Sequence, residues 1–590
     1  MQRKRRKKRG NPLLTRKINS KMRMKLVWLF GMVVLAFVGL GIRITVINAS
    51  QGNQYSKQVL SQSQQKYDSR VIPFKRGDIT DRNGVVLATS EKVYKVILDC
   101  KVVNTKEEYV EPTIKALVDV MGLDEETVRK KLEDETTKDS QYQILQSNVS
   151  INQKKAFEDY TDVSGEEAKE KLTKEEIAER SNIKGVWFEE DYRRVYPLNS
   201  TASHLVGFTY TGNSADWGIE GYYSSTLNGV NGRQFGYYNS DADVEQNIID
   251  PINGNSVEST IDLNIQQVVE KYISNFMDGM ANGPRGAEGA ANVGVIVANP
   301  KNGEILAMAT DNPYDLNNPR DLTSHYSQDE INGMDNDTML EKLYGIWKNY
   351  CISDAFEPGS TVKPLTIGAA LDADVVQPSD TFVCDGYQMF GGTRIRCSIY
   401  PGAHGTETLS DLIKHSCNDG LMQIGALLGP EEFLKYQKIF NFGATTGIDL
   451  PGEATGILHT EESLSSGSTE LASASFGQGY TCTMIQEIAA ICSVINGGYY
   501  YQPHLVTKIL DSNGGTVKTI SPILLKQTIS SRISSDIRSY MALSVQQGTS
   551  RHSKVQGYSS GGKTGTAEKY PRGNGKYLVS FIGFAPVDDP

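Results

Sequence analysis

The segment that most restricts how this chain can fold is an apolar run of 22 residues near its start, at positions 26–47. At about 1.5 Å per residue, a helix of that length reaches across the ~30 Å hydrocarbon layer of a bilayer. Arg43, near the end of the run, can extend its long side chain to the headgroups. A cleaved signal peptide has a shorter apolar core and a clear cleavage site, to which Ala49–Ser50 is a weak match. The run therefore predicts an uncleaved transmembrane anchor.

The residues before this run predict its orientation. Positions 1–25 contain twelve lysines and arginines and no acidic residue, whereas the whole chain has a formal charge of −9. Basic residues beside a membrane span stay on the cytoplasmic side. We therefore expect residues 1–25 to form a cytoplasmic tail and everything after residue 47 to lie outside the cell membrane. Because the exported part is acidic, nucleic acid is not expected as a partner.

The exported part is too long for one ordinary domain, and its character changes near residue 260. Before that point, Asn83–Gly84 between short apolar stretches predicts a β-hairpin, and residues 105–180 have the apolar spacing and charge of surface helices. After it, two β-runs joined by a tight turn, at 295–298 and 304–309, open a further domain. The two units expected are a domain without catalytic residues over 48–260 and an α/β domain over 261–590.

Seven cysteines, an odd number, all lie after the apolar run. They are too few for a disulfide framework. Cys384 and Cys397 could form a disulfide, or could join His404 and Asp385 in a metal site. Because no tight Cys-x-x-Cys pair is present, the sequence favours unbonded thiols, and we expect neither a metal ion nor a cofactor.

The segment with the clearest chemical meaning is Phe356–Pro364. Its Pro358–Gly359 pair predicts a turn, and Pro364 fits the first turn of a helix, so a helix should begin at about Ser360. Ser360 and Lys363 are three residues apart and would project from one face of that turn. A serine hydroxyl becomes a nucleophile when a base takes its proton, and burial can lower the pKa of a lysine enough for its neutral amine to do so. The pair predicts a serine nucleophile with a lysine base.

Ser-x-x-Lys alone is weak evidence, because the same spacing recurs at Ser63, Ser181 and Ser560. The turn and helix around Ser360, and two further motifs downstream, distinguish it from these repeats.

The first downstream motif contains Ser416 and Asn418, which are two residues apart and can face one cleft. A hydroxyl there could relay protons, and an amide group can both donate to and accept from a peptide. The second contains Lys563, Thr564 and Thr566 on a glycine-flanked strand. These offer one cation and two hydroxyls to the carboxylate of a peptide that adds along the sheet edge. The glycines have the wrong spacing for a phosphate-binding loop.

In this order, the three segments resemble the motifs of penicillin-binding proteins and serine β-lactamases. Further segments resemble the class B, monofunctional transpeptidases, and nothing before residue 260 resembles a glycosyltransferase. The resemblance implies a multidomain fold with a single N-terminal transmembrane helix, an elongated α+β pedestal or dimerisation domain, and a transpeptidase domain with an antiparallel sheet flanked by helices. The segments that carry it are Arg76–Gly84, Gly218–Gly221, Thr260–Asp262, Ser360–Lys363, Ser416–Asn418, Phe476–Gly479 and Lys563–Gly565.

The resemblance also implies a D,D-transpeptidase that cross-links peptidoglycan, of the division or sporulation type. Ser360 would attack the penultimate D-Ala of a stem peptide and release the terminal D-Ala, while Lys363 and Ser416 move the proton. Asn418 would hold the substrate amide, and the backbone N–H groups of Ser360 and Thr566 would form the oxyanion hole. An amine of a second stem peptide would resolve the acyl-enzyme, and β-lactams would acylate the same serine. The substrate carboxylate would bind to Lys563, Thr564, Gly565 and Thr566.

The implied partners are the lipid-linked precursor, a SEDS-type glycosyltransferase and division proteins. The alternative functions are a β-lactamase or β-lactam sensor on the same fold, and a cell-division scaffold with an inert catalytic domain. A hydrolase needs a base that activates water, and no glutamate lies in such a motif.

The end of the sequence departs from the resemblance. After an apolar run at 577–584 the sequence stops at Pro590, whereas the resemblance implies one further strand and a C-terminal helix. We expect a truncated domain with an open sheet edge that folds poorly.

Overall fold

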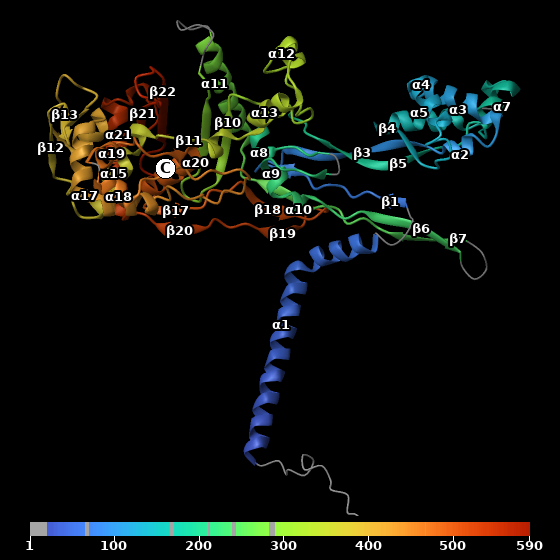
Figure 1. Cartoon of the computed structure of the whole chain (residues 1–590), viewed down its shortest axis with the longest axis horizontal. Helices are drawn as coiled ribbons and strands as arrows, with labels where there is room; N and C mark the ends of the chain where they lie inside the picture. The colour runs from blue at the N-terminus through green and yellow to red at the C-terminus, as the bar shows by residue number, and fades with distance from the viewer. Residues whose placement is uncertain are drawn as a thin grey trace, which may run out of the picture. The chain divides into compact units, whose positions relative to one another are not determined.

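The structure, a computed structural model, describes residues 20–64, 70–165, 170–210, 213–238, 244–281, 290–466 and 468–590 (Figure 1). The chain divides into two compact units. The first comprises the segment up to Ile72 together with Val230–Ile252, and the second comprises Pro73–Gly229 and Asn253–Pro590.

The first unit contains a long helix and a small sheet. Helix α1 (Ser20–Gln64) includes an apolar window, Arg23–Arg43, whose mean hydropathy of 2.2 and length are sufficient to cross a membrane. Its large apolar side chains are exposed, among them Trp28 and Phe37, each at 72%. The window overlaps the predicted anchor at 26–47, while the predicted tail lies mostly outside the described residues. The sheet is antiparallel, in the order β1 (Arg70–Ile72), β6 (Gly232–Tyr238) and β7 (Val244–Ile249).

A seven-stranded sheet runs through the second unit and crosses the boundary predicted near residue 260. Asn83–Gly84 forms the predicted tight turn, with a φ of 84° at Gly84. Strands from both halves of the sequence pair directly, since Ser256–Ser259 contacts Ile79–Thr80 in parallel and Val506–Leu510 in antiparallel register. The sheet order is β19 (Thr516–Thr519), β18 (Val506–Leu510), β8 (Ser256–Ser259), β2 (Ile79–Thr80), β3 (Val86–Leu98) and β4 (Gln143–Val149), with β5 (Val186–Val195) also paired to β3.

Buried ion pairs connect two of the N-terminal segments that carry the resemblance, Arg76–Gly84 and Gly218–Gly221. The Glu220 carboxylate accepts a hydrogen bond from Arg76 Nε at 2.8 Å and one from Arg194 Nε at 2.6 Å. Arg76 and Glu220 are almost completely buried. Because an unpaired buried charge is strongly destabilising, the loss of either partner would destabilise the fold. At Gly77 a Cβ atom would clash with the backbone of Asn255, which explains the glycine beside Arg76.

The helices predicted over 105–180 are present, but one strand interrupts them. Ile114, Leu117 and Met121 are buried and Val118 is partly buried in one hydrophobic cluster, as their spacing predicts. Strand β4 lies within the predicted helical region because its backbone pairs with β3, a contact that local periodicity does not report. The helices are α2 (Cys100–Val103), α3 (Glu107–Asp119), α4 (Glu125–Glu133), α5 (Ile151–Thr161) and α7 (Lys174–Ser181).

The remaining strands of the second unit form antiparallel pairs. The two β-runs predicted around residue 300 are β9 (Gly294–Ala298) and β10 (Ile305–Thr310), which pair with each other. Among the described strands, β22 (Tyr577–Phe584) pairs with β21 (Gly561–Glu568) alone, so one edge of β22 is open. The other pairs are β11 (Ala355–Phe356) with β16 (Cys482–Thr483), β12 (Thr381–Cys384) with β15 (Gly405–Thr408), β13 (Tyr387–Phe390) with β14 (Thr393–Arg396), and β17 (Tyr499–Tyr501) with β20 (Leu524–Gln527).

The largest apolar cluster is built around α15 and α17. Figure 1 shows these two helices beside α18, α19 and α21, with β12, β13, β20 and β22 toward the outside of the group. Within this part of the chain the helices are α8 (Ser203–Val206), α9 (Gly218–Tyr222), α10 (Ser224–Leu227), α11 (Leu263–Ala281), α12 (Gln328–Asn332), α13 (Asn336–Trp347), α14 (Tyr350–Ser353), η2 (Gly359–Val362), α15 (Lys363–Asp372), α16 (Leu409–His415), α17 (Asn418–Ile439), α18 (Glu461–Ser466), α19 (Ser468–Ser475), α20 (Met484–Ile495), α21 (Ser531–Gln547) and η3 (Arg551–Ser553).

Candidate active site

Ser360 lies on a short helical turn that leads into α15. The turn η2 is a 3-10 helix, and Pro364 occupies the first turn of α15, as the sequence predicts. Gly359 precedes the serine with a φ of 63°, and its N–H donates to the Gly477 carbonyl at 2.8 Å. The Ser360 hydroxyl has no hydrogen-bond partner within the described chain, so the structure does not contain the expected serine–lysine contact.

Lys363 is completely buried and contacts the second motif. Its Nζ atom lies 2.7 Å from the Ser416 carbonyl oxygen, 2.7 Å from Asn418 Oδ1 and 3.2 Å from Ser416 Oγ. Burial penalises the ammonium form and lowers the pKa of Lys363 to about 8. A substantial neutral fraction of this amine near physiological pH is what a general base requires.

Lys563, which belongs to the third motif, also contacts the Ser416 hydroxyl. Its Nζ atom donates to Ser416 Oγ at 2.8 Å and to the Thr564 carbonyl at 2.8 Å. Lys563 is also completely buried. Desolvation, together with the nearby charge of Lys363, lowers the pKa of Lys563 well below its usual range. One serine hydroxyl therefore lies within hydrogen-bond distance of two buried amines.

The corner between α16 and α17 holds the second motif. Ser416 ends α16 in the left-handed conformation, with a φ of 58°. Cys417 then caps α17 by accepting a hydrogen bond from the Gly420 N–H, and Asn418 is the first residue of that helix. The tight corner turns Ser416 Oγ and Asn418 Oδ1 toward the same lysine, as the sequence predicts for residues that share one cleft.

Strand β21 carries the third motif beside η2. At Gly565 a Cβ atom would clash with Ser580 Oγ and lie 2.9 Å from Thr361 Cγ2. Glycine therefore allows the strand to approach η2, the turn of the predicted nucleophile Ser360, which we call the nucleophile turn. Thr566 is exposed, and its hydroxyl donates to the Gly565 carbonyl at 2.9 Å. The Thr564 hydroxyl lies 3.3 Å from Thr549 Oγ1. Both hydroxyls lie on the strand that carries Lys563.

The sequence did not indicate the acidic residues around the nucleophile turn. Glu357 accepts a hydrogen bond from the Gly479 N–H at 2.9 Å and forms an ion pair with Arg572 at 2.7 Å. Glu487 is buried beside the Thr361 hydroxyl, and burial raises its pKa to about 7. The Glu-Pro-Gly-Ser segment was the available signal for Glu357, whereas Glu487 lies on an apolar helix with no motif around it.

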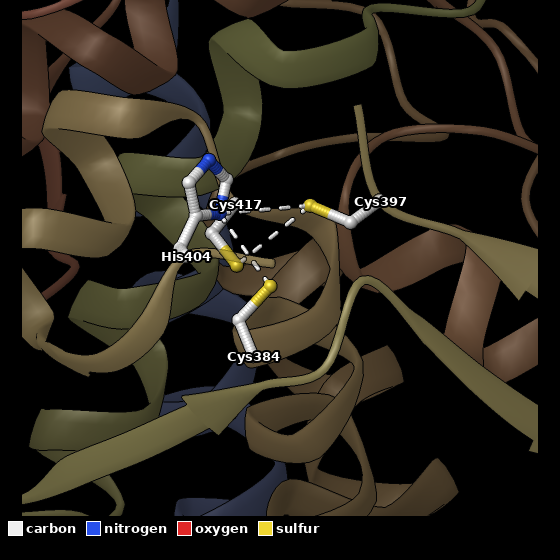
Figure 2. A group of neighbouring side chains, drawn as sticks. All are labelled: Cys384, Cys397, His404 and Cys417. Carbon is white, nitrogen blue, oxygen red and sulfur yellow. Dashed lines mark hydrogen bonds between the residues drawn. The ribbon is translucent and has the colours of Figure 1, made fainter. Parts of the chain in front are cut away.

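Close to the second motif, four side chains could hold a metal ion. Cys384, Cys397, His404 and Cys417 place their ligand atoms within 4.8 Å of one another (Figure 2). All seven cysteines are free thiols, as predicted. Asp385 is not a member of this group, contrary to the metal alternative considered from the sequence. Its N–H donates to the Asp419 carboxylate, and Cys417 completes the group instead.

Comparison with known families covers most of the chain. Residues 293–590 match the family model described as the penicillin binding protein transpeptidase domain, and residues 71–259 match the penicillin-binding protein dimerisation domain. Solved structures with a similar fold include penicillin binding protein 2X from Streptococcus thermophilus, with a TM-score of 0.67 at 22% identity over 89% of this chain and 75% of that one. Another is penicillin binding protein 3 from Mycobacterium tuberculosis in complex with aztreonam, with a TM-score of 0.59 at 21% identity over 88% and 89%.

Relatives of similar length support the same assignment. Stage V sporulation protein D from Bacillus subtilis is 34% identical over 97% of this chain and 81% of its own length. Peptidoglycan D,D-transpeptidase FtsI from Buchnera aphidicola is 26% identical over 87% of this chain and 80% of its own length. The chain therefore belongs to the class B penicillin-binding proteins, the D,D-transpeptidases of peptidoglycan synthesis.

Proposed function

We propose that this chain cross-links peptidoglycan through an acyl-enzyme on Ser360. The observation that carries the proposal is the convergence of three distant motifs, in which Ser416 Oγ lies 3.2 Å from Lys363 Nζ and 2.8 Å from Lys563 Nζ. Ser360 lies on the helical turn η2, which leads directly into α15 and its first residue, Lys363. A nucleophile, a base and a proton relay are the parts that acyl transfer requires.

The proton path follows from the donors and acceptors. Lys363 in its neutral form has two N–H donors, which suit the Ser416 carbonyl and Asn418 Oδ1 at 2.7 Å each. Its lone pair is then available for the proton of Ser360 as that oxygen attacks the penultimate D-Ala carbonyl. Because Lys563 donates to Ser416 Oγ, the Ser416 hydroxyl hydrogen is free to pass to the leaving amine of the terminal D-Ala. Lys363 then returns a proton to Ser416.

Strand β21 supplies the substrate-binding groups. The charged form of Lys563 would bind the terminal carboxylate of the stem peptide, with Thr564 and Thr566 as hydrogen-bond donors. The carboxylate would in turn raise the depressed pKa of Lys563, so that substrate binding restores the charge that recognises it. The N–H groups of Ser360 and Thr566 would stabilise the oxyanion, a feature typically worth about 3–4 kcal/mol per donor. Asn418 would hold the substrate amide.

We place the catalytic domain outside the cell, anchored by the apolar window of α1. The basic residues before that window support a cytoplasmic N-terminus. The substrate partners would be stem peptides and their lipid-linked precursor, and the expected protein partners are a SEDS-type glycosyltransferase and division proteins. The name of the Bacillus subtilis relative supports a role in sporulation.

Covalent labelling with a fluorescent penicillin tests the nucleophile. The full chain, purified in detergent, should form a labelled band that resists denaturation, and Ser360→Ala should abolish it. Ser181→Ala is the matched control, because Ser181 has the same Ser-x-x-Lys spacing but lies exposed on α7, and it should label normally. Labelling that survives in Ser360→Ala would contradict the proposal.

Timed release of the label distinguishes a transpeptidase from a hydrolase. A transpeptidase that lacks an acceptor amine should keep the penicilloyl group for many minutes, whereas a β-lactamase would release it within seconds. Release within seconds would favour the hydrolase, with Glu487 as the first residue to test.

A further inference from the structure

Three cysteines and one histidine from four separate segments meet beside the second motif (Figure 2). Cys384 ends β12, Cys397 follows β14, His404 precedes β15, and Cys417 lies in the corner between α16 and α17. The three cysteines are at most 3% exposed, and the His404 side chain is 13% exposed. Each contributes one soft or borderline donor atom to a common centre.

The distances between the donor atoms match the edges of a coordination tetrahedron. With Zn–S bonds of about 2.3 Å and Zn–N bonds of about 2.0–2.1 Å, a regular tetrahedron has S···S edges of about 3.8 Å and S···N edges of about 3.5 Å. The Cys397 and Cys417 sulfurs are 3.9 Å apart. His404 Nδ1 is 3.5 Å from Cys384 Sγ and 3.9 Å from Cys397 Sγ.

A buried carboxylate, that of Glu407, lies next to the four ligand side chains. Glu407 is 2% exposed, and its Oε2 atom is on the side of His404. That oxygen lies 3.5 Å from His404 Nδ1, while Oε1 lies 2.6 Å from His415 Nδ1. The two histidine rings are stacked, with centroids 5.3 Å apart. A divalent ion at the centre of the four ligands would offset two of the three thiolate charges, and Glu407 would lie outside its ligand shell.

We propose that Cys384, Cys397, His404 and Cys417 bind one Zn²⁺ ion. Three thiolates and an imidazole in tetrahedral order select zinc over the oxygen-preferring Mg²⁺ and Ca²⁺. With four protein ligands the ion has no open position for water or substrate, so its role is structural.

The zinc ion holds the catalytic corner in place. Cys417 lies between Ser416 and Asn418, so a metal bond to its sulfur restrains the backbone of both residues. The Asn418 N–H donates to Cys397 Sγ at 3.3 Å, and its side chain reaches the Arg396 carbonyl at 3.4 Å. The ion thereby ties this corner, which holds Lys363, to the β12–β15 segment. Ser416 and Asn418 are positioned by the metal.

Metal analysis of the full chain tests the site. The protein, purified in detergent with a reductant and without chelator, should contain about one zinc ion per chain by inductively coupled plasma mass spectrometry. Cys397→Ser should lower the zinc content at least tenfold, as expected for the loss of one ligand. Cys492→Ser is the matched control, because Cys492 lies outside the group and should leave the zinc content unchanged. His404→Cys, which preserves a four-ligand set, should retain zinc.

A metal-loss experiment on the unchanged protein avoids variants that fail to fold. Removal of zinc with a strong chelator, followed by Co²⁺, should produce the visible bands and sulfur-to-cobalt charge transfer of a tetrahedral thiolate site. Wild-type protein that is folded, labels with penicillin and contains no stoichiometric zinc would overturn the proposal. A disulfide between two of the three cysteines in that active protein, found by mass spectrometry, would overturn it as well.

Discussion

At the scale of single residues, the two lysines of the site share an environment, but the proposed mechanism requires opposite charge states of them. Burial lowers the pKa of both, to about 8 for Lys363 and well below its usual range for Lys563. A base has to be neutral before it acts, whereas a carboxylate ligand has to be charged. Because only Lys563 would meet the substrate carboxylate, binding can separate the two protonation states. The same hydroxyl, Ser416 Oγ, connects them.

The depressed pKa of Lys363 predicts how acylation depends on pH. Below about pH 8 the amine is protonated and inactive, so the second-order rate constant for labelling by a fluorescent penicillin should rise about tenfold per pH unit and level off above that value. Lys363→Arg, which stays charged, should not label at any pH. Lys526→Met is the control, because the pKa of Lys526 is also lowered by burial but the residue lies outside the site. A flat profile between about pH 6 and 9 would contradict the assignment of Lys363 as the base.

The sequence predicted which residues form the site but not how they meet. The turn at Pro358–Gly359 and the proline at 364 are local signals, and they placed the helix start correctly. The contact of Lys363 with Ser416 and Asn418 arises from tertiary packing. The spacing of residues along the sequence does not predict such a contact. For the same reason the sequence grouped Cys384 and Cys397 with Asp385, and Cys417 was missed although it lies within the second motif.

At the scale of elements, the nucleophile turn depends on a glycine loop that packs against it. Gly477 has a φ of 93°, and a Cβ atom there would clash with the Gly359 carbonyl. Gly477→Ala should therefore combine left-handed strain of about 1–2 kcal/mol with an overpacking cost of about 1–3 kcal/mol. Because the displaced turn carries Ser360, penicillin labelling should slow more than tenfold, and the midpoint of thermal unfolding should fall.

Gly514→Ala separates strain from steric displacement. Gly514 has a similar φ of 85°, but nothing lies within 4 Å of an added Cβ atom. This variant should lose about 1–2 kcal/mol and label at the normal rate. Equal labelling rates in the two variants would show that the contact between Gly477 and Gly359 does not position the nucleophile.

The elements that sequence reasoning identified are those with strong local signals. The hairpin turn at Asn83–Gly84 and the two β-runs before residue 310 have turn chemistry and alternation within a few residues. Strand β4 has a polar sequence and forms because β3 offers it a partner, which explains why it was predicted as helix. Pairing over hundreds of residues, as between Val257 and Ile509, has no local signature.

At the scale of the whole molecule, the two family models match on either side of the division expected at residue 260. The backbone hydrogen bonds of the seven-stranded sheet, in contrast, cross that division. The two family matches end and begin at residues 259 and 293. Yet the sheet that contains β3 and β5 continues through β8 into β18 and β19. Within the second unit, the N-terminal segments and the catalytic segments therefore share backbone hydrogen bonds. We infer that the non-catalytic segments of this unit contribute directly to the stability of the transpeptidase fold.

The membrane topology is the remaining property of the whole chain, and the first 47 residues predict it. The apolar window of α1 is long enough to span a bilayer, and the twelve basic residues at positions 1–25 favour retention on the cytoplasmic side. In intact cells, a membrane-impermeant fluorescent penicillin should label the chain without permeabilisation. Replacing the basic residues at positions 3–25 with serine and glutamine should reduce the labelled fraction, because the orientation signal is lost. The control replaces three lysines of the second unit, Lys115, Lys130 and Lys138, which should leave the labelled fraction unchanged. Labelling that requires permeabilised cells would show that the catalytic domain lies inside.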